Sequence, residues 1–421
     1  MTGIDLNTEA LRNHAADINS IATDAIADVV NAAGGQLTTM PTAFGIIAGP
    51  AVVPPLTGLS LAATGMATAT SGVGMAIAGG VDGTAAMMEL VEDELTKMLG
   101  GTPDTHGAGT SELGYDGNLV STGTKKPWSE VRLVGPAFAT MQSIADADGG
   151  FSWDVAIDGA TFALDALTAV VDPGSIVFGA VAGFVLELIP PAMWFVDMLT
   201  GDPVAINGCS TTWINMGNQM RTASEDYFTS VNTVLGSWKD AGGLAYAAVG
   251  DAFGGFMGAS GALCTLVGTA VTAAGFICAT MRGIVIDMIG ALIAWLVAEI
   301  AAGLAAASVT FGAALGPVIT FCMAHVSMVC ASIAGKIGKG MTKLAKLGEA
   351  CGQNTTALRT AAQQLDDYSS SLKDLAHALR GTTPDIRAAA TMIGDMKDLH
   401  KVVKRTDSLL GPILDPPDIP A

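Results

Sequence analysis

Apolar residues recur at helical spacing through most of this chain. Over residues 6–30 two interleaved sets of apolar positions, each seven residues apart, predict a helix whose start Asn7 or Thr8 can cap. These sets are Leu11, Ile18 and Ala25, and Ala15, Ala22 and Val29.

A second apolar stretch follows without a single charged residue from Val29 to Val81. It is rich in Gly, Thr and Ser, and it is interrupted by Pro50, Pro54 and Pro55. These polar atoms and helix breakers favour a loop, followed by a small-residue helix that ends near Met98, over a membrane span. Residues 1–100 are therefore expected to form a helical hairpin.

Residues 101–127 contain the densest turn chemistry and no apolar period, which predicts a flexible linker at a domain boundary. Short apolar helices are expected within 128–200, around 156–170 and 174–189, before Pro190 and Pro191 end the pattern.

A clearer helix signal begins at Asp202-Pro203, where an N-capping Asp precedes a Pro at the first helical position. Its predicted core face follows a heptad repeat of Trp213, Met220, Tyr227 and Val234, with Met216 and Ala223 between them. The pattern ends at Trp238. There Gly242 and Gly243 are expected to adopt left-handed conformations in a tight turn between two helices.

Residues 252–335 carry only three charges, Arg282, Asp287 and Glu299. Residues 261–281, 283–307 and 309–330 are each long enough to cross a bilayer. The alternative is that they form the centre of a soluble bundle, because neighbouring helices can bury an all-round apolar helix as well as lipid can. We slightly favour a soluble form that is able to rearrange into a membrane.

Two regularly spaced sets of residues, one of lysines and one of leucines, follow the apolar stretches. The "lysine stripe", spaced to share one helical face, fits anionic lipid headgroups or a solvated surface and comprises Lys336, Lys339, Lys343 and Lys346. The "leucine seam", a strict heptad that can pair with another helix or lie in the chain's own core, comprises Leu358, Leu365, Leu372 and Leu379. We assign 201–351 to one hairpin with an apolar helical extension and 352–410 to C-terminal helices, one over roughly 384–410. The Pro-rich tail 411–421 closes the chain.

The composition and net charge of the chain exclude some classes of fold and partner. Among 421 residues, half are hydrophobic and 14% are charged, and the small-residue content favours closely packed helices over β-sandwiches. The net charge of -19 repels phosphate backbones, so we exclude nucleic acid as a partner. The N-terminus lacks the basic and apolar regions of a cleavable signal peptide.

The six cysteines have neither paired nor metal-finger spacing. We interpret them mainly as small buried hydrophobic residues. A chain reversal near residue 304 would bring Cys278 level with Cys330, whereas a reversal near Gly316-Pro317 would match Cys278 with Cys351.

No catalytic, cofactor or metal site is predicted. The five histidines are scattered, and none neighbours a nucleophile together with a third orienting residue. The segment 335–341 lacks the spacing of a phosphate loop, and 146–154 lacks several ligand positions of a calcium loop.

The stretch around the predicted turn carries a family resemblance. Trp238, Ala245 and Tyr246 have the spacing W-(x)6-A-Y, which resembles the Trp-X-Gly proteins, the small helical-hairpin substrates of type VII (ESX) secretion, over about 201–260. The third motif position departs from the family, because Asp240 replaces Gly and the glycines stand at 242 and 243. The family's Tyr-x-x-x-Asp/Glu signal is missing too, since Gly250 lies four residues after Tyr246.

The first hundred residues are similar to EspC-type ESX secretion-associated proteins, themselves expected to be helical hairpins. The segments that carry this likeness are 6–34, the TAFG at 42–45, and a small-residue helix ending in acidic residues.

Together the patterns and the resemblance predict an all-α fold of helical hairpins and long apolar helices in an elongated bundle. The resemblance implies a non-enzymatic secretion substrate that acts by helix-helix pairing, and by membrane insertion, outside the cell or in the envelope of an actinobacterium. Its expected partners are the type VII machinery, a small helical protein or a second copy, and a membrane. The alternative is an integral membrane or channel-forming protein.

Overall fold

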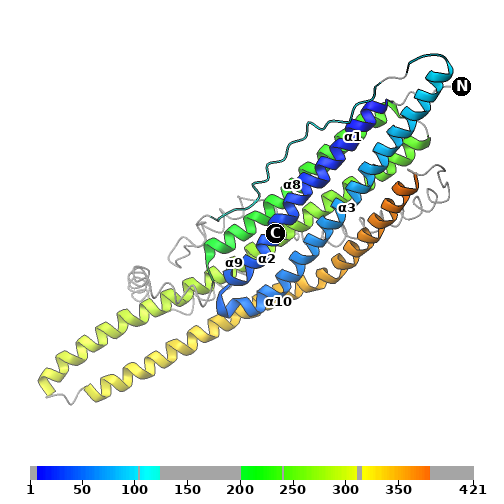
Figure 1. The fold of residues 1–421 in the computed structure, drawn as a ribbon. Coiled ribbons are helices and arrows are strands. Elements are labelled where there is room, and N and C mark those ends of the chain that lie inside the picture. The colour runs from blue at the N-terminus through cyan, green and yellow to red at the C-terminus, as the bar shows by residue number, and fades with distance from the viewer. Residues whose placement is uncertain (1–6, 103–104, 124–200, 239–240, 311–314, 380–421) are drawn as a thin grey trace, which may run out of the picture.

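The computed structural model describes residues 7–102, 105–123, 201–238, 241–310 and 315–379. Every regular element in these ranges is helical, so the all-α prediction is confirmed. The elements are α1 (Thr8–Ser20), a π-helical turn η1 (Ile21–Ala25), α2 (Ile26–Ala43), α3 (Gly45–Met98), α8 (Pro203–Ser237), α9 (Ala241–Thr310) and α10 (Leu315–Leu379). Figure 1 shows that most of these helices extend along one long direction.

The first hairpin joins α1, η1 and α2 to the antiparallel helix α3. Asn7 caps α1, because its side-chain oxygen accepts the N–H of Ala10 at 3.1 Å. The chain reverses at Phe44 and Gly45, where the glycine has a φ of 67° that other residues rarely adopt.

The loop expected after Val29 is wrong, because α2 continues to Ala43 and α3 runs through three prolines, at 50, 54 and 55. Each proline removes one backbone donor from the helix. The apolar stripe of Ala48, Val52 and Leu56 is nevertheless fully buried along the same turns. Burial of this face stabilises the helix by more than the lost hydrogen bonds destabilise it. Proline positions alone therefore do not predict where this helix ends.

The second hairpin pairs α8 with α9. The predicted start of α8 is confirmed, since Asp202 accepts the N–H of Val204 at 2.9 Å and Pro203 occupies the first turn. The predicted core face is confirmed as well: Trp213, Met216, Met220, Ala223, Tyr227 and Val234 are all buried.

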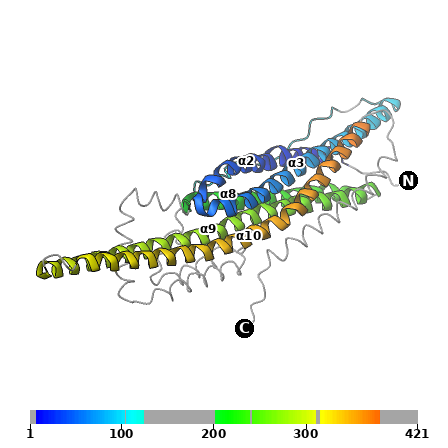
Figure 2. The same ribbon diagram turned by 90° about the horizontal axis from the view of Figure 1, so that it is seen from below.

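The two hairpins pack into one four-helix arrangement (Figures 1 and 2). The order around it is α1–α2, α3, α9 and α8, and each neighbouring pair is antiparallel. The contact of Thr70 with Ser260 at 3.2 Å joins α3 to α9, and that of Gln219 with the Ala25 carbonyl at 2.9 Å joins α8 to the first hairpin. A single apolar core contains residues from both hairpins, so they do not form the separated units that a flexible linker implies.

The segment 105–123 is not helical, but it also differs from a free linker because it lies along α1 and α8. The N–H of Thr110 donates to Asn13 at 3.0 Å, and the N–H of Ser121 donates to the Thr212 hydroxyl at 2.9 Å. Leu119 is buried in the shared core. Its turn residues thus provide polar partners for neighbouring helices instead of freedom of movement.

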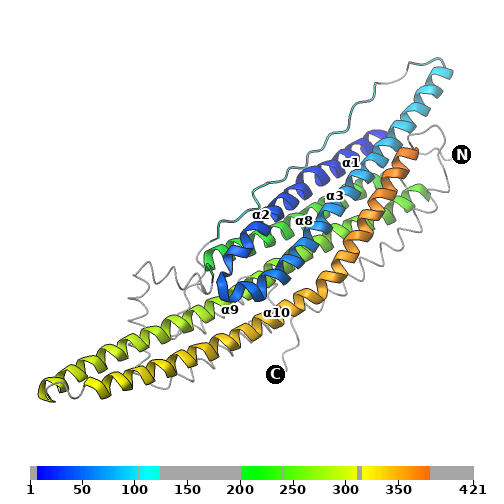
Figure 3. The same ribbon diagram turned by 60° about the horizontal axis from the view of Figure 1, so that its bottom comes forward.

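Helices α9 and α10 extend beyond the four-helix arrangement (Figures 1 and 3). The chain reverses between Thr310 and Leu315, between the two positions expected from sequence. α10 then returns alongside α9 and runs parallel to α3, where the backbone of Gly348 approaches Pro55 and that of Gly58 approaches Thr355. The projecting portions pair through Trp295 and His325, whose rings stack with centroids 3.8 Å apart.

All six cysteines lie in the described ranges, and none is bonded to another. Five are buried and Cys330 is exposed, which agrees with the interpretation as mainly buried hydrophobic residues. Neither proposed pairing of Cys278 is present. The short helices expected within 128–200, the 146–154 loop, the helix at 384–410 and the tail 411–421 lie outside the described residues.

The close contact of α8 with α9 at Gly217 can be tested with a matched pair of substitutions, Gly217→Ala and Gly80→Ala. A Cβ on Gly217 would lie 2.7 Å from the Gly261 carbonyl oxygen, whereas one on Gly80 would meet no atom within 4 Å. Gly217→Ala should lower the free energy of unfolding by about 1–3 kcal/mol through overpacking. Gly80→Ala should raise it by about 0.5–1 kcal/mol through helix propensity. Urea unfolding followed by circular dichroism measures both; equal effects would contradict the close approach of α8 and α9.

Candidate helix-pairing site

The predicted corner comprises Trp238, Gly242, Gly243, Ala245 and Tyr246, and it is a true reversal of the chain. Helix α8 ends at Ser237, and the N–H of Trp238 donates to the Val234 carbonyl at 3.1 Å. The Trp238 indole stacks on Tyr246 with ring centroids 5.5 Å apart and an angle of 21° between planes. The indole therefore covers the first turn of α9 and packs against the shared core.

The glycines of the corner act differently from the expectation. Gly242 and Gly243 both lie inside α9, so the left-handed conformation predicted for them is wrong. A Cβ on Gly243 would stand 2.1 Å from the Trp238 carbonyl oxygen. The residue is needed for this close approach, because any side chain would collide with the end of α8.

Tyr246 also connects the corner to the first hairpin through a partly buried chain of hydrogen bonds. The Tyr246 hydroxyl lies 2.5 Å from His14 Nε2, and His14 Nδ1 lies 2.7 Å from the Ser230 hydroxyl. The Ser230 hydroxyl donates to Asp17 at 2.6 Å. The four side chains come from α1, α8 and α9, and we call them the inter-hairpin relay.

The relay has one consistent direction of donation. Because Ser230 donates its only proton to Asp17, His14 Nδ1–H donates to Ser230, and Nε2 accepts from the Tyr246 hydroxyl. This makes His14 a neutral imidazole with both nitrogens satisfied. Burial lowers the pKa of His14 to about 4 despite the opposing charge of Asp17, and burial raises the pKa of Tyr246 well above its usual value.

The π-helical turn η1 provides a second connection. A π turn widens the helix and disturbs its regular pattern of backbone hydrogen bonds. Ser71 of α3 donates to the Ala22 carbonyl at 2.9 Å, and Gln219 of α8 donates to the Ala25 carbonyl at 2.9 Å. The irregular turn thus lies where two neighbouring helices supply donors.

Asp17 joins the relay to the segment 105–123. One of its carboxylate oxygens accepts from Ser230, and the other accepts from the Ser111 hydroxyl at 2.8 Å. Nearby, the Tyr115 hydroxyl donates to Asp226 of α8 at 3.0 Å. Both hairpins and the segment between them therefore meet at one carboxylate.

An ion pair holds the far end of the first hairpin. Arg12 of α1 binds Glu89 of α3 through two hydrogen bonds, one of 2.6 Å from Nε, and lies 3.7 Å from Asp82. The hydrogen bonds from Arg12 lower the pKa of Glu89, although burial acts in the opposite direction.

The relay contains a serine and a histidine, but its geometry does not activate the serine. A nucleophilic serine donates to the histidine that removes its proton. Here the serine donates to a carboxylate, and the histidine is 1% exposed. The arrangement pairs buried polar groups between helices, so its role is structural.

The other sequence-predicted residues are not brought to the corner. Lys339 and Lys346 are exposed, Lys343 is half-buried and Lys336 is buried, so the lysine stripe is not one uniformly solvated face. Leu358, Leu365, Leu372 and Leu379 lie on α10, but their side chains are outside the described residues and their seam stays a prediction.

Sequence reasoning missed the relay, although a signal for it exists. His14 lies three residues after Leu11 and four before Ile18, on the buried face of α1. A polar side chain on such a face needs partners. Which residues supply them depends on helices more than 200 positions away, which α1 alone does not specify.

Comparisons with known proteins add no family. No family model, no curated protein and no solved structure matches this chain. Within the described ranges, no group of three or more His, Cys, Asp or Glu side chains could hold a metal ion.

The relay predicts an acid-sensitive fold. The unfolded chain protonates His14 near pH 6.5, whereas the folded chain does so only near pH 4, so acidification favours unfolding across this window. The free energy of unfolding should fall by about 2 kcal/mol between pH 7 and 5. Glu89, whose pKa is lowered from 4.5, adds its loss at lower pH.

Urea titrations at pH 7, 6 and 5 measure this loss. His14→Gln should flatten the profile in this range because it removes the titrating group. Thr229→Ala, at an exposed position of α8, removes no titratable group; it is the control and should keep the wild-type profile. A wild-type profile in His14→Gln would show that another group carries the pH dependence.

Proposed function

We propose that this protein is a non-enzymatic substrate of the type VII (ESX) kind, exported to the cell envelope or the medium, which acts through helix-helix pairing. The observation that carries this proposal is the corner. Trp238 closes an antiparallel hairpin whose apolar face is covered by a second hairpin. A paired set of helical hairpins agrees with the resemblance of 201–260 to the Trp-X-Gly substrates and of 1–100 to EspC-like proteins.

The packing of the two hairpins against each other determines where a partner could bind. The face of the corner hairpin that would accept a small helical protein is occupied by α1, α2 and α3 of the same chain. We therefore propose that pairing at this face occurs within the chain. A separate helical partner or a second copy would use another surface, for which the leucine seam of α10 is the candidate.

We also propose that the exported protein associates with a membrane. In the part of the chain that the structure describes, three helical stretches are long and apolar enough to cross a bilayer by length and composition: Gly45–Met98, Val249–Leu292 and Ile319–Glu349. Membrane association is compatible with export to the cell envelope, and both belong to this proposal.

An integral membrane or channel-forming protein is the second candidate, favoured by Ile319–Glu349, of whose apolar window only 11% is buried. The first candidate is preferred because 78% of the Val249–Leu292 window is buried inside the helical bundle, where protein replaces lipid. Fractionation without detergent separates the two. A monodisperse species in water supports the substrate, whereas recovery only with detergent supports the membrane protein.

Export generates the next prediction, tested by comparing secretion of Trp238→Ala and Leu244→Ala. Trp238→Ala should reduce the protein in the culture medium to the level of a strain without the type VII ATPase, because it removes the indole that closes the hairpin. Leu244→Ala, at a position 72% exposed on the same turn, should leave export unchanged. Immunoblots of medium and cell lysate measure both. Unchanged medium levels in the ATPase-deficient strain would overturn the proposal.

A further inference from the structure

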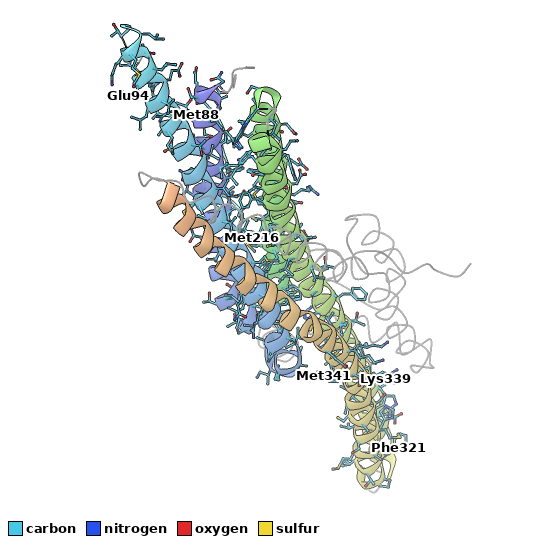
Figure 4. All side chains as sticks on the ribbon, turned by 90° about the vertical axis from the view of Figure 1, so that its right-hand side faces the viewer. Met88, Glu94, Met216, Phe321, Lys339 and Met341 are labelled. Carbon is cyan, nitrogen blue, oxygen red and sulfur yellow. The ribbon has the colours of Figure 1, made fainter. Side chains whose placement is uncertain are left out.

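The projecting ends of α9 and α10 form a surface that the other described helices leave uncovered. We define the apolar hairpin as residues 288–310 of α9 and 315–335 of α10. Figure 4 shows Phe321 near the free end of the projection and Lys339 and Met341 farther toward the bundle. Large apolar side chains point outward along α10: Ile319, Phe321, Met323 and Met328 are between 56% and 68% exposed.

This exposure separates the apolar hairpin from the other stretches of membrane-spanning length. Gly45–Met98 and Val249–Leu292 line the shared core, so moving either of them into lipid requires the bundle to open. The window in Ile319–Glu349 is only 11% buried. Its apolar surface can enter lipid while the bundle stays folded, and large exposed apolar patches mark interaction surfaces.

The length of the uncharged run fits the hydrocarbon layer of a bilayer. Residues 315–335 contain no Asp, Glu, Lys or Arg, and 21 helical residues rise about 31 Å, close to the layer's thickness of about 30 Å. On α9, residues 288–310 contain one charge, Glu299. The stacking of Trp295 on His325 sets the two arms level, so Asp287 and Lys336 lie at similar distances from the tip.

Charge identifies the kind of membrane. The chain has 39 acidic and 20 basic residues, yet 300–348 contains four lysines and no acidic residue. The lysines begin where the uncharged run ends, and Lys339 and Lys346 are exposed. Basic residues directly beside an inserting segment favour anionic headgroups over zwitterionic ones.

We propose that the apolar hairpin inserts into an anionic lipid bilayer as a unit, with the exposed Lys339 and Lys346 at the headgroups and the four-helix bundle intact outside. This inference rests on the membrane association proposed above and identifies the segment and the lipid. It does not depend on export, because purified protein and vesicles test it directly.

Cys330 provides the probe, since it is the exposed cysteine among the six. The full chain carrying an environment-sensitive fluorophore at Cys330 is mixed with phosphatidylcholine vesicles, with and without phosphatidylglycerol. We expect a blue shift and co-flotation with the anionic vesicles, and continued protection of buried Cys264 from a thiol reagent. No shift, or exposure of Cys264 on binding, would overturn insertion of the hairpin with an intact bundle.

A matched pair of variants locates the contact. Met328→Asp places a carboxylate among the acyl chains and should weaken vesicle binding about 100-fold. Leu90→Asp makes the same change at a residue of similar exposure on α3, 65% against 63%, and should leave binding unchanged. Equal loss in both variants would overturn the assignment. Both positions are exposed, and unchanged thermal unfolding confirms that the bundle is intact.

Three further substitutions test the charges. Lys339→Gln with Lys346→Gln should remove most of the preference for anionic vesicles, at about fivefold per lysine. Glu299→Gln should strengthen binding, since it removes the single carboxylate from the inserted part. Self-association is the competing explanation of the exposed surface: a dimer without lipid that Met328→Asp dissociates, together with no vesicle binding, would overturn the proposal in favour of a second copy.

Discussion

Burial of two apolar hairpin faces against each other is the constraint on which the rest of this structure depends. The faces combine large aliphatic and aromatic residues with many alanines, and glycines stand where the helices approach most closely. Close approach leaves little room for water, and each polar atom at the contact needs a protein partner. The inter-hairpin relay and the donors at η1 provide such partners. They also fix the register between the two hairpins, because sliding α1 by one turn separates His14 from both Ser230 and Tyr246.

Much of the fold was predictable where the signal is local. The cap at Asp202-Pro203, the seam from Trp213 to Val234 and the reversal after Trp238 depend on residues within a few turns of one another, and the structure contains all three. The predictions were wrong where contacts between distant segments determine the local conformation. Prolines 50, 54 and 55 were expected to break the helix, but burial of the adjacent stripe keeps it continuous. Turn residues in 105–123 predicted flexibility, but their hydrogen bonds hold that segment to two helices.

In the candidate site, too, the local contacts are predictable from sequence and the long-range contacts are not. Trp238 and Tyr246 were identified from spacing, and they are in contact. The role of Gly243 was misjudged, because close packing and left-handed conformation both select glycine and a sequence does not distinguish them. His14 was absent from the predicted site, since its partners lie 216 and 232 positions away along the chain. A long-range polar network depends on the packing of the hairpins, which the local pattern leaves open.

The unequal lengths of the paired helices have a mechanical consequence. Helix α8 has 35 residues, whereas α9 has 70 and runs without interruption from the corner to the reversal near residue 310. At 1.5 Å per residue, the part of α9 from Ile284 in the shared core to Thr310 is about 39 Å long, so a tilt of about 5° where the helix leaves the core displaces Thr310 by about 3 Å. Small repacking at the end of the core is thereby converted into larger travel at the distal end.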